Sequence, residues 1–350
     1  MVSGTNSADD PRQGKGRGFF NRNVEPKAEV VEGLIREGQI VALGGPYRVG
    51  KSPLLHDLTI CLLRGISWCG RKVIRRPIIA FDFESSSPMY KGNLLRIALR
   101  YQVPEPSVPN ELAPYLQNDD PNEPLTARLL QALKSKNLGA RLGLVDDALQ
   151  SKPDAVVIVD PTELLFRIDT REKAHVTELF SNYRCLLAKY PKVVLINTFN
   201  MRKRDRKTRR RPDLLSDPRG WLEEICGTLD LMNRSDVRLG MDFYGSEDDG
   251  IKVINGLRRG EDLDPILIRP YGDQPHDLAG FERIPPDQVS LTKRLTVKQR
   301  EYWDKLPKEF SFQEAVDIMG KANFSRLRGR ALSQGILEDG FSGVYRKLLG

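Results

Sequence analysis

The chain of 350 residues carries 55 Lys and Arg against 47 Asp and Glu, so its net charge is +8. With 39% hydrophobic and 29% charged residues, and no apolar run near the roughly 18 residues of a membrane helix, the composition excludes a helical membrane protein. It favours a soluble protein with one large and one small domain. Residues 1–23 are largely polar and lack a secretory signal, so we expect a disordered tail and a cytoplasmic location.

The cysteines are scattered without a CxxC pair, and only three histidines accompany them. A structural zinc site would need paired cysteines or clustered histidines. We therefore expect reduced thiols, mostly in the core, at Cys61, Cys69, Cys185 and Cys226.

From residue 30 to about residue 270, short apolar runs alternate with longer amphipathic stretches. Nearly continuous apolar runs are typical of strands that helices cover on both faces. The predicted strands are Ile40–Leu43, Ile78–Phe83, Ala155–Val159 and Val193–Asn197. The predicted helices are Leu54–Leu63, Tyr90–Tyr101, Leu125–Leu133, Arg141–Gln150 and Arg171–Tyr190. This alternation predicts an α/β domain over residues 24–272, with a mostly parallel sheet.

Two later apolar runs, Val237–Tyr244 and Ile251–Asn255, flank a polar turn with glycine at both ends. They predict an antiparallel hairpin that extends the sheet. Residues 273–290 are rich in Pro and Asp and predict a linker to a second unit.

Residues 291–350 predict a small domain of three helices and a wing. The first helix covers Thr296–Leu306, and a capping box at Ser311 begins a second helix that ends at Met319. The third helix covers Phe324–Ser333, and Ile336–Tyr345 predicts two strands joined by a glycine turn. Together they predict a winged helix-turn-helix, with Lys321, Arg326, Arg328 and Arg330 on or before the third helix. Such domains contact DNA or dock proteins, and both alternatives stay open.

The stretch Gly45-Pro46-Tyr47-Arg48-Val49-Gly50-Lys51-Ser52 fits G-x-x-x-x-G-K-[ST], the phosphate-binding Walker A loop. It follows a predicted strand and precedes an apolar helix, so backbone N–H groups and the helix dipole would surround a β-phosphate. Lys51 would reach the β- and γ-phosphates and Ser52 would coordinate Mg²⁺, which implies ATP and Mg²⁺. Pro53 has no N–H, and we expect a weaker hold near the α-phosphate. The alternative is a coincidental turn.

Two acids are candidates for metal binding and for water activation. Asp160 ends the apolar run Val156–Val159, where its carboxylate can bind the Mg²⁺ shell. Glu84 follows Ile78–Phe83, and at the end of a strand neighbouring the phosphate-loop strand it would deprotonate the attacking water. An N-cap or surface acid is the alternative for Glu84. Asp82 competes for its role, but strand alternation puts Asp82 one step deeper on the same face.

These features resemble those of a known family. The resemblance includes Glu32-Gly33-Leu34-Ile35 before the first strand, and Gly65, Trp68 and Gly70 after the helix. Over residues 30–270 the chain is similar to RecA-like ATPases of the plasmid RepA type, relatives of DnaB-like replicative helicases and of KaiC. The resemblance implies a RecA-like fold, a hexameric ring with nucleotide between subunits, and movement on single-stranded DNA. It also implies that Glu84 is the catalytic glutamate and Asp160 the Walker B aspartate.

Two further roles follow from the resemblance. Asn197 and Thr198 end the next strand, where the family places a polar sensor of the γ-phosphate, often with a His that this chain replaces. Arg258, in Leu257-Arg258-Arg259-Gly260, matches a residue that reaches the γ-phosphate of the neighbouring subunit. Where the family has a companion lysine, this chain has Gly256. The alternative is that Arg258 and Arg259 are only turn residues.

A basic run directly follows the sensor strand. Its members are Arg202, Lys203, Arg204, Arg206, Lys207, Arg209, Arg210 and Arg211. With the single acid Asp205 these eight bases give +7, so the rest of the chain contributes only +1 to the net charge of +8. RecA-like proteins place DNA-contacting loops at this position, and such bases would contact phosphates without reading sequence. A solvated loop or a localisation signal is the alternative.

The sequence therefore predicts a DNA-dependent ATPase, helicase-like, of replication or recombination, which binds single-stranded or duplex DNA. The alternative is a nucleotide-gated DNA-binding regulator or loader with slow turnover. A small-molecule kinase is disfavoured because no lid-like acceptor site is evident and the second domain would have no role.

Overall fold

The structure is a computed structural model that describes residues 26–104, 111–135, 137–201, 212–225, 229–245, 250–259, 261–272, 278–285, 289, 295, 297–333, 336–340 and 343–348. The predicted tail, residues 1–23, and the whole basic run, residues 202–211, lie outside these ranges.

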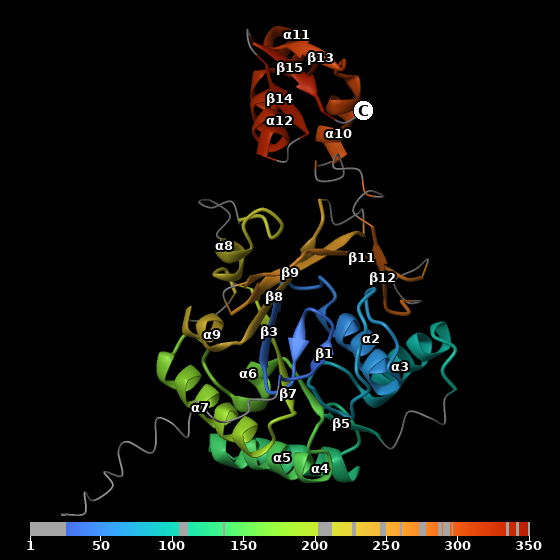
Figure 1. Ribbon diagram of the computed structural model, residues 1–350, viewed down its shortest axis with the longest axis vertical. Helices are drawn as coiled ribbons and strands as arrows, with labels where there is room; N and C mark the ends of the chain where they lie inside the picture. Colours follow the sequence, from blue (N-terminus) through green and yellow to red (C-terminus); the bar gives the residue numbers. More distant parts are fainter. Residues whose placement is uncertain are drawn as a thin grey trace, which may run out of the picture.

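A large mixed sheet forms the centre of the first domain (Figure 1). Its order is β12 (Phe281–Ile284), β11 (Ile266–Pro270), β9 (Lys252–Arg258), β8 (Val237–Phe243), β3 (Ile40–Gly45), β7 (Val194–Asn200), β6 (Val156–Asp160), β4 (Ile78–Asp82) and β5 (Leu112–Leu116). From β8 to β5 all neighbours are parallel, whereas β9, β11 and β12 pair antiparallel, and β10 (Glu261–Asp262) pairs with β9. The predicted α/β class with a mostly parallel sheet is confirmed.

Helices cover the two faces of the sheet and enclose a separate core on each (Figure 1). One face carries α2 (Lys51–Arg64) and α3 (Ser87–Arg100), together with the small hairpin of β1 (Glu29–Val31) and β2 (Ile35–Arg36). The other carries α4 (Pro124–Lys134), α5 (Leu138–Ser151), α6 (Thr162–Phe166), α7 (Lys173–Lys189), α8 (Pro218–Leu222) and α9 (Leu229–Arg234).

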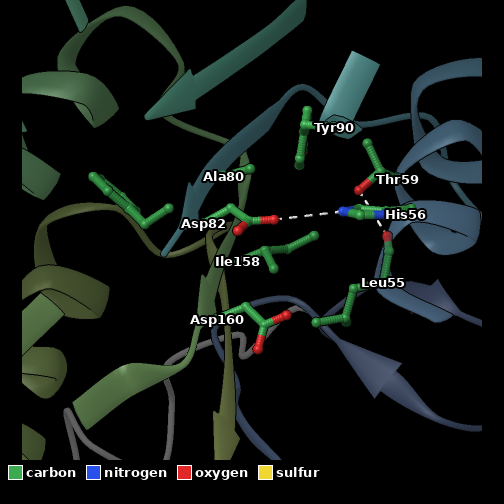
Figure 2. Close-up of a pocket in the computed structure, with 9 residues that line it drawn as sticks. Leu55, His56, Thr59, Ala80, Asp82, Tyr90, Ile158 and Asp160 are labelled. Atoms are coloured by element: carbon green, nitrogen blue, oxygen red, sulfur yellow. Dashed lines mark hydrogen bonds and ion pairs between the residues drawn. The ribbon is translucent and has the colours of Figure 1, made fainter. Parts of the chain in front are cut away.

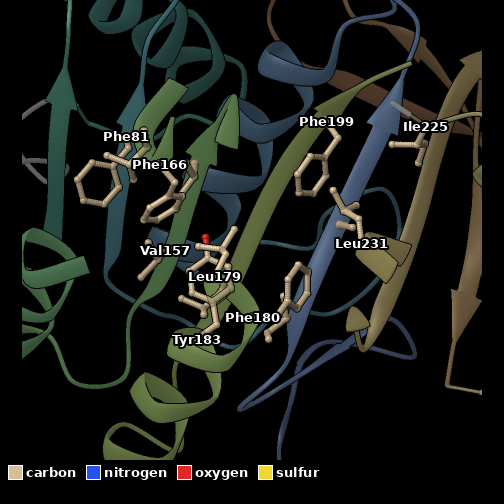
Figure 3. Close-up of a cluster of buried hydrophobic side chains, with 14 of the residues drawn as sticks. Phe81, Val157, Phe166, Leu179, Phe180, Tyr183, Phe199, Ile225 and Leu231 are labelled. Atoms are coloured by element: carbon tan, nitrogen blue, oxygen red, sulfur yellow. The ribbon is translucent and has the colours of Figure 1, made fainter. Parts of the chain in front are cut away.

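Strand β6 shows why the central strands are apolar throughout. Val157 and Val159 pack into the core under α7, and Val156 and Ile158 pack into the core under α2. Figure 3 shows Val157 in the first of these cores, among aromatic side chains that include Phe180. A strand buried on both faces has no place for polar alternation.

Two expectations about the sheet are wrong. Strand β4, which leads to Glu84, does not neighbour the phosphate-loop strand β3, because β7 and β6 lie between them. The predicted linker 273–290 contains β12, which pairs with β11 and completes the edge of the sheet. The first domain therefore extends at least to Ile284.

The C-terminal unit has its own core and its own small sheet. It consists of α10 (Val297–Lys305), β13 (Glu309–Ser311), α11 (Phe312–Met319), α12 (Lys321–Ser333), β14 (Leu337–Asp339) and β15 (Val344–Lys347). The strand order is β13-β15-β14, all antiparallel, over a core that includes Trp303, Phe310, Phe324 and Tyr345. The capping box expected at Ser311 is present, since Ser311 and Glu314 each bond the other's backbone N–H. None of the helices in the described ranges is long and apolar enough to cross a membrane.

Asp57 is a buried charge that joins three elements of the first domain. It lies on α2 and is fully buried. Its Oδ1 accepts a hydrogen bond from the Tyr101 hydroxyl at 3.1 Å and lies 3.8 Å from Arg100 Nη1, at the end of α3. Its Oδ2 accepts from the Phe281 N–H of β12 at 3.4 Å. Burial raises its pKa to about 6, although Arg100 and these hydrogen bonds oppose the rise.

We expect Asp57→Asn to stabilise the protein at neutral pH. The folded-state pKa exceeds the unfolded value of 3.8, so stability falls as the pH rises from about 4 to about 6 and stays reduced above. Removing the charge should therefore add up to about 3 kcal/mol to the free energy of unfolding at pH 7.5, and less at pH 5. Urea unfolding at both pH values measures this. Asp146→Asn is the control of opposite sign, because the hydrogen bond from Lys189 lowers the pKa of Asp146. An Asp57→Asn protein less stable than the parent at pH 7.5 would contradict the expectation.

Candidate nucleotide site

The loop from Gly45 to Ser52 connects β3 to α2, as predicted. Gly50 caps α2 with φ 103°, a left-handed conformation that favours glycine. A Cβ on Gly45 would lie 2.9 Å from the carbonyl oxygen of Met241, so this close approach also requires glycine. Tyr47 and Arg48 are exposed at the tip of the loop. Both glycines of the motif therefore have a structural reason that a coincidental turn would not supply.

Pro53 occupies the first turn of α2. The first helical hydrogen bond runs from the Leu54 N–H to the Gly50 carbonyl, so the missing N–H of Pro53 interrupts no helical bond. An anion at this helix terminus can still be met by the N–H groups of Gly50, Lys51 and Ser52.

Lys51 is the centre of the site. Its Nζ donates to the carbonyl oxygens of Gly45 at 3.2 Å and Pro46 at 3.5 Å, and to Asn200 Oδ1 at 3.2 Å. Burial lowers the pKa of Lys51, and the nearby carboxylates of Asp160, Glu84 and Glu163 oppose that shift. A single ammonium group thus lies among oxygen acceptors and within electrostatic range of three acids.

Asp160 ends β6 on the same face as Lys51. It is 7% exposed, and its Oδ1 accepts a hydrogen bond of 2.5 Å from the Thr198 hydroxyl of the neighbouring strand β7. Ser52 is half-buried in the first turn of α2. A carboxylate and a hydroxyl at these two positions are the oxygen ligands that Mg²⁺ takes beside a bound triphosphate.

Glu84 lies two residues beyond the end of β4 and is exposed. Partial desolvation of its carboxyl group raises its pKa, the charge of Asp160 raises it further, and Lys51 opposes the rise. Glu84 is therefore close to both groups although β4 is not adjacent to β3, because β4 adjoins β6. The two acids predicted for the site end neighbouring parallel strands, and such ends share one edge of the sheet.

Glu163 is an acid of the site that sequence reasoning did not select. It lies in the first turn of α6, three residues after Asp160. Its Oε2 is buried and has no hydrogen-bond partner within the described structure. Burial raises its pKa, while its own N–H, Lys51 and the Asn200 N–H oppose the rise. Its only signal in the sequence is its position shortly after a strand-ending aspartate.

The structure does not bring Asn197 to the site, which corrects the expected sensor. Asn197 Oδ1 accepts hydrogen bonds from the Tyr183 hydroxyl at 2.6 Å and the Thr162 hydroxyl at 3.2 Å, on the face covered by α7. Side chains alternate along a strand, so Thr198 and Asn200 occupy the face of Lys51. These two residues hold Asp160 and Lys51, respectively.

Arg258 lies at the far edge of the sheet from the phosphate loop of its own chain. It ends β9 and is in register with Val237, the first residue of β8, whereas the loop follows the end of β3. Its guanidinium pairs with Glu261 at 2.7 Å and with Glu29 at 3.6 Å. Within one chain it therefore lies away from the described residues of the site.

The basic run lies outside the described residues, but its entry point is described. Asn200, which bonds Lys51, is the last residue of β7, and the run begins two residues later at Arg202.

The loop, the strand-ending Asp160 and the strand order together define a P-loop ATPase of the RecA-like kind, in which one strand, β7, separates the loop strand from the strand of Asp160. Residues 17–197 match the family model AAA_25, described as an AAA domain, which is 181 of 350 residues. The chain belongs to this AAA domain family. The crystal structure of the RadB recombinase matches 71% of this chain and 92% of its own, at 12% identity and a TM-score of 0.46. No curated protein matches the chain significantly.

We expect Lys51→Ala to weaken binding of a fluorescent ATP analogue by about 10- to 100-fold, the loss typical of a hydrogen bond to a charged group. Titration of the analogue followed by fluorescence measures this. Lys72→Ala is the control, because Lys72 is an exposed lysine that has no part in the loop. Unchanged affinity in Lys51→Ala would contradict the placement of the phosphates.

Proposed function

We propose that the protein is a DNA-dependent ATPase, helicase-like, which acts in DNA replication or recombination and hydrolyses ATP at subunit interfaces. The observation that carries this proposal is the hydrogen bond between Lys51 and Asn200. It joins the phosphate loop to the strand end from which the basic run begins. A phosphate that changes the contacts of Lys51 acts on the segment best suited to bind a nucleic acid backbone.

In this proposal the chain supplies every group that ATP hydrolysis needs. Lys51 and the loop N–H groups bind the triphosphate, and Ser52 and Asp160 hold Mg²⁺, which neutralises charge on the phosphates. Glu84 deprotonates the attacking water, which suits a carboxylate whose pKa is raised beside Asp160. Thr198 and Asn200 take the sensor role, because both lie on the face of Lys51.

The site is proposed to lie between copies of the chain in a ring of six. Three large apolar side chains are exposed on segments that adjoin its residues in the sequence: Tyr47 at 77%, Met89 at 48% and Leu164 at 48%. They lie close in sequence to Lys51, Glu84 and Glu163, respectively, and a second copy would cover them. Arg258 at the opposite edge fits a head-to-tail arrangement, in which that edge faces the site of the next subunit.

The C-terminal unit is proposed to be a winged helix that contacts DNA. Support comes from its order of helix, strand, two helices and two strands, and from the exposed Lys321 and Arg326 on α12. Arg328, by contrast, pairs with Asp339 of β14. A regulator that binds duplex DNA through this unit, with slow turnover, is the alternative function.

We expect Glu84→Gln to bind ATP with parental affinity and to lose hydrolysis by on the order of 100-fold or more, the typical contribution of a general base. Glu163→Gln is the matched variant, since it removes the acid near Lys51 to which the proposal gives no role, and we expect it to keep most of the rate. Phosphate release measures turnover for both. The reverse result, an active Glu84→Gln and an inactive Glu163→Gln, would transfer the role of base to Glu163.

We expect single-stranded DNA to stimulate hydrolysis, and the Arg209, Arg210 and Arg211 triple alanine variant to weaken binding evenly across DNA sequences. Each DNA phosphate that the variant no longer neutralises should lower the slope of log affinity against log salt by about 0.7. Fluorescence anisotropy at several salt concentrations measures this. Lys72→Ala with Lys134→Ala is the control, because these exposed lysines belong neither to the basic run nor to the C-terminal unit. Sequence-specific duplex binding without stimulation of hydrolysis would favour the regulator.

A further inference from the structure

Asp82 is a buried acid beside the site that has no part in holding nucleotide in the proposal above. It is the last residue of β4 and lies in register with Asp160 of β6. It is 4% exposed. A buried carboxylate costs free energy unless it is paired and hydrogen-bonded, so its partners define its role.

One oxygen of Asp82 caps the turn that carries Glu84. Oδ1 accepts hydrogen bonds from the Glu84 N–H at 2.8 Å and from the Ser85 N–H at 2.7 Å. On the other side of the turn, the Phe83 N–H donates to the Asp160 carbonyl at 3.0 Å. The backbone at Glu84 is thus tied both to Asp82 and to the strand of the metal-binding acid.

The second oxygen of Asp82 faces the phosphate-loop helix. Oδ2 lies 3.6 Å from Nε2 of His56, a buried residue of α2 five positions after Lys51 (Figure 2). His56 is itself held from α3, since its Nδ1 lies 3.5 Å from Asn93 Nδ2 and its ring meets Tyr90 edge-on at 4.8 Å. Asp82 therefore connects the turn of Glu84 to the helix that begins at Lys51.

Hydrogen bonds outweigh burial at Asp82. Burial alone would raise the pKa of Asp82, but His56 and the N–H groups of Ser85 and Glu84 hold it below the ordinary value. The bonds to the turn are accordingly charge-assisted, which makes them shorter and stronger than bonds to a neutral acceptor.

We propose that Asp82, held by His56, is a positioning residue that fixes Glu84 relative to Lys51 and Asp160. The inference rests on the proposed function, in which Glu84 activates the water. Without the Asp82 carboxylate, two N–H groups of the turn lose their acceptor, and one of them belongs to the buried Ser85. The carboxylate of Glu84 is then still present but is no longer held in position. Displacement of a catalytic group by about 1 Å can lower the rate by up to about 100-fold.

The test compares Asp82→Ala, Asp82→Asn and His56→Ala for kcat and for affinity towards a fluorescent ATP analogue. We expect Asp82→Ala to lower kcat by about 10- to 100-fold with affinity unchanged within about twofold. Asp82→Asn should recover most of the rate, because its amide oxygen can still accept the two N–H bonds. His56→Ala should lower kcat less than Asp82→Ala, and it carries the test if Asp82→Ala does not fold. Asp57→Asn, which changes a buried acid of α2 that does not contact the turn of Glu84, is the control and should leave kcat unchanged.

A double variant separates positioning from a general loosening of the fold. In the Glu84→Gln background, adding Asp82→Ala should cause no further loss of rate, because nothing remains to be positioned. Three outcomes would each overturn the inference about Asp82 and leave the proposed function standing. They are additive losses in the double variant, equal losses in rate and affinity in Asp82→Ala, and full activity in both Asp82→Ala and His56→Ala. Full activity in Glu84→Gln would overturn both the assigned base and the inference.

Discussion

The site depends on one half-buried ammonium group, that of Lys51. Lys51 can be held at this position because carbonyl oxygens of its own loop and the amide oxygen of Asn200 accept its hydrogen bonds, while the charges of Asp160, Glu84 and Glu163 oppose the effect of burial on its pKa. Without the lysine, Glu84 and Glu163 would lose the positive charge that opposes the rise of their pKa values. The groups proposed to bind a triphosphate therefore also compensate one another's charges when no triphosphate is bound.

The parallel sheet gathers these groups from distant parts of the sequence. Strands β4, β6, β7 and β3 end at one edge, so the turn after Asp82, the end of β6 and the polar end of β7 all meet the phosphate loop. The buried residues of these strands are needed for packing in the cores on the two faces. The residues that follow each strand end are therefore the ones that can contribute functional side chains.

Most of the site could be predicted from the sequence, since strand-ending acids and a glycine-rich loop have local signatures. Glu163, the order of the strands and the true end of β7 needed the structure. Strand order is set by packing over long distances, so nothing near Glu84 indicated that β4 adjoins β6 and not β3. The predicted end of β7 at Asn197 was three residues short of Asn200, and on a strand an odd shift exchanges the faces. Likewise β12 was hidden within a Pro- and Asp-rich stretch that resembled a linker.

The hydrogen bond between Lys51 and Asn200 can be broken without disturbing the loop. The three described acceptors of Lys51 comprise two backbone oxygens, which the loop geometry fixes, and one exposed side chain, which can rotate. An anion that accepts a hydrogen bond from this ammonium group would displace one of the three acceptors. The amide oxygen of Asn200 is displaced most easily, because its side chain can rotate away. Under the proposed function, an anion bound in the loop would thereby free the side chain of Asn200, the last residue of β7, two positions before the basic run begins.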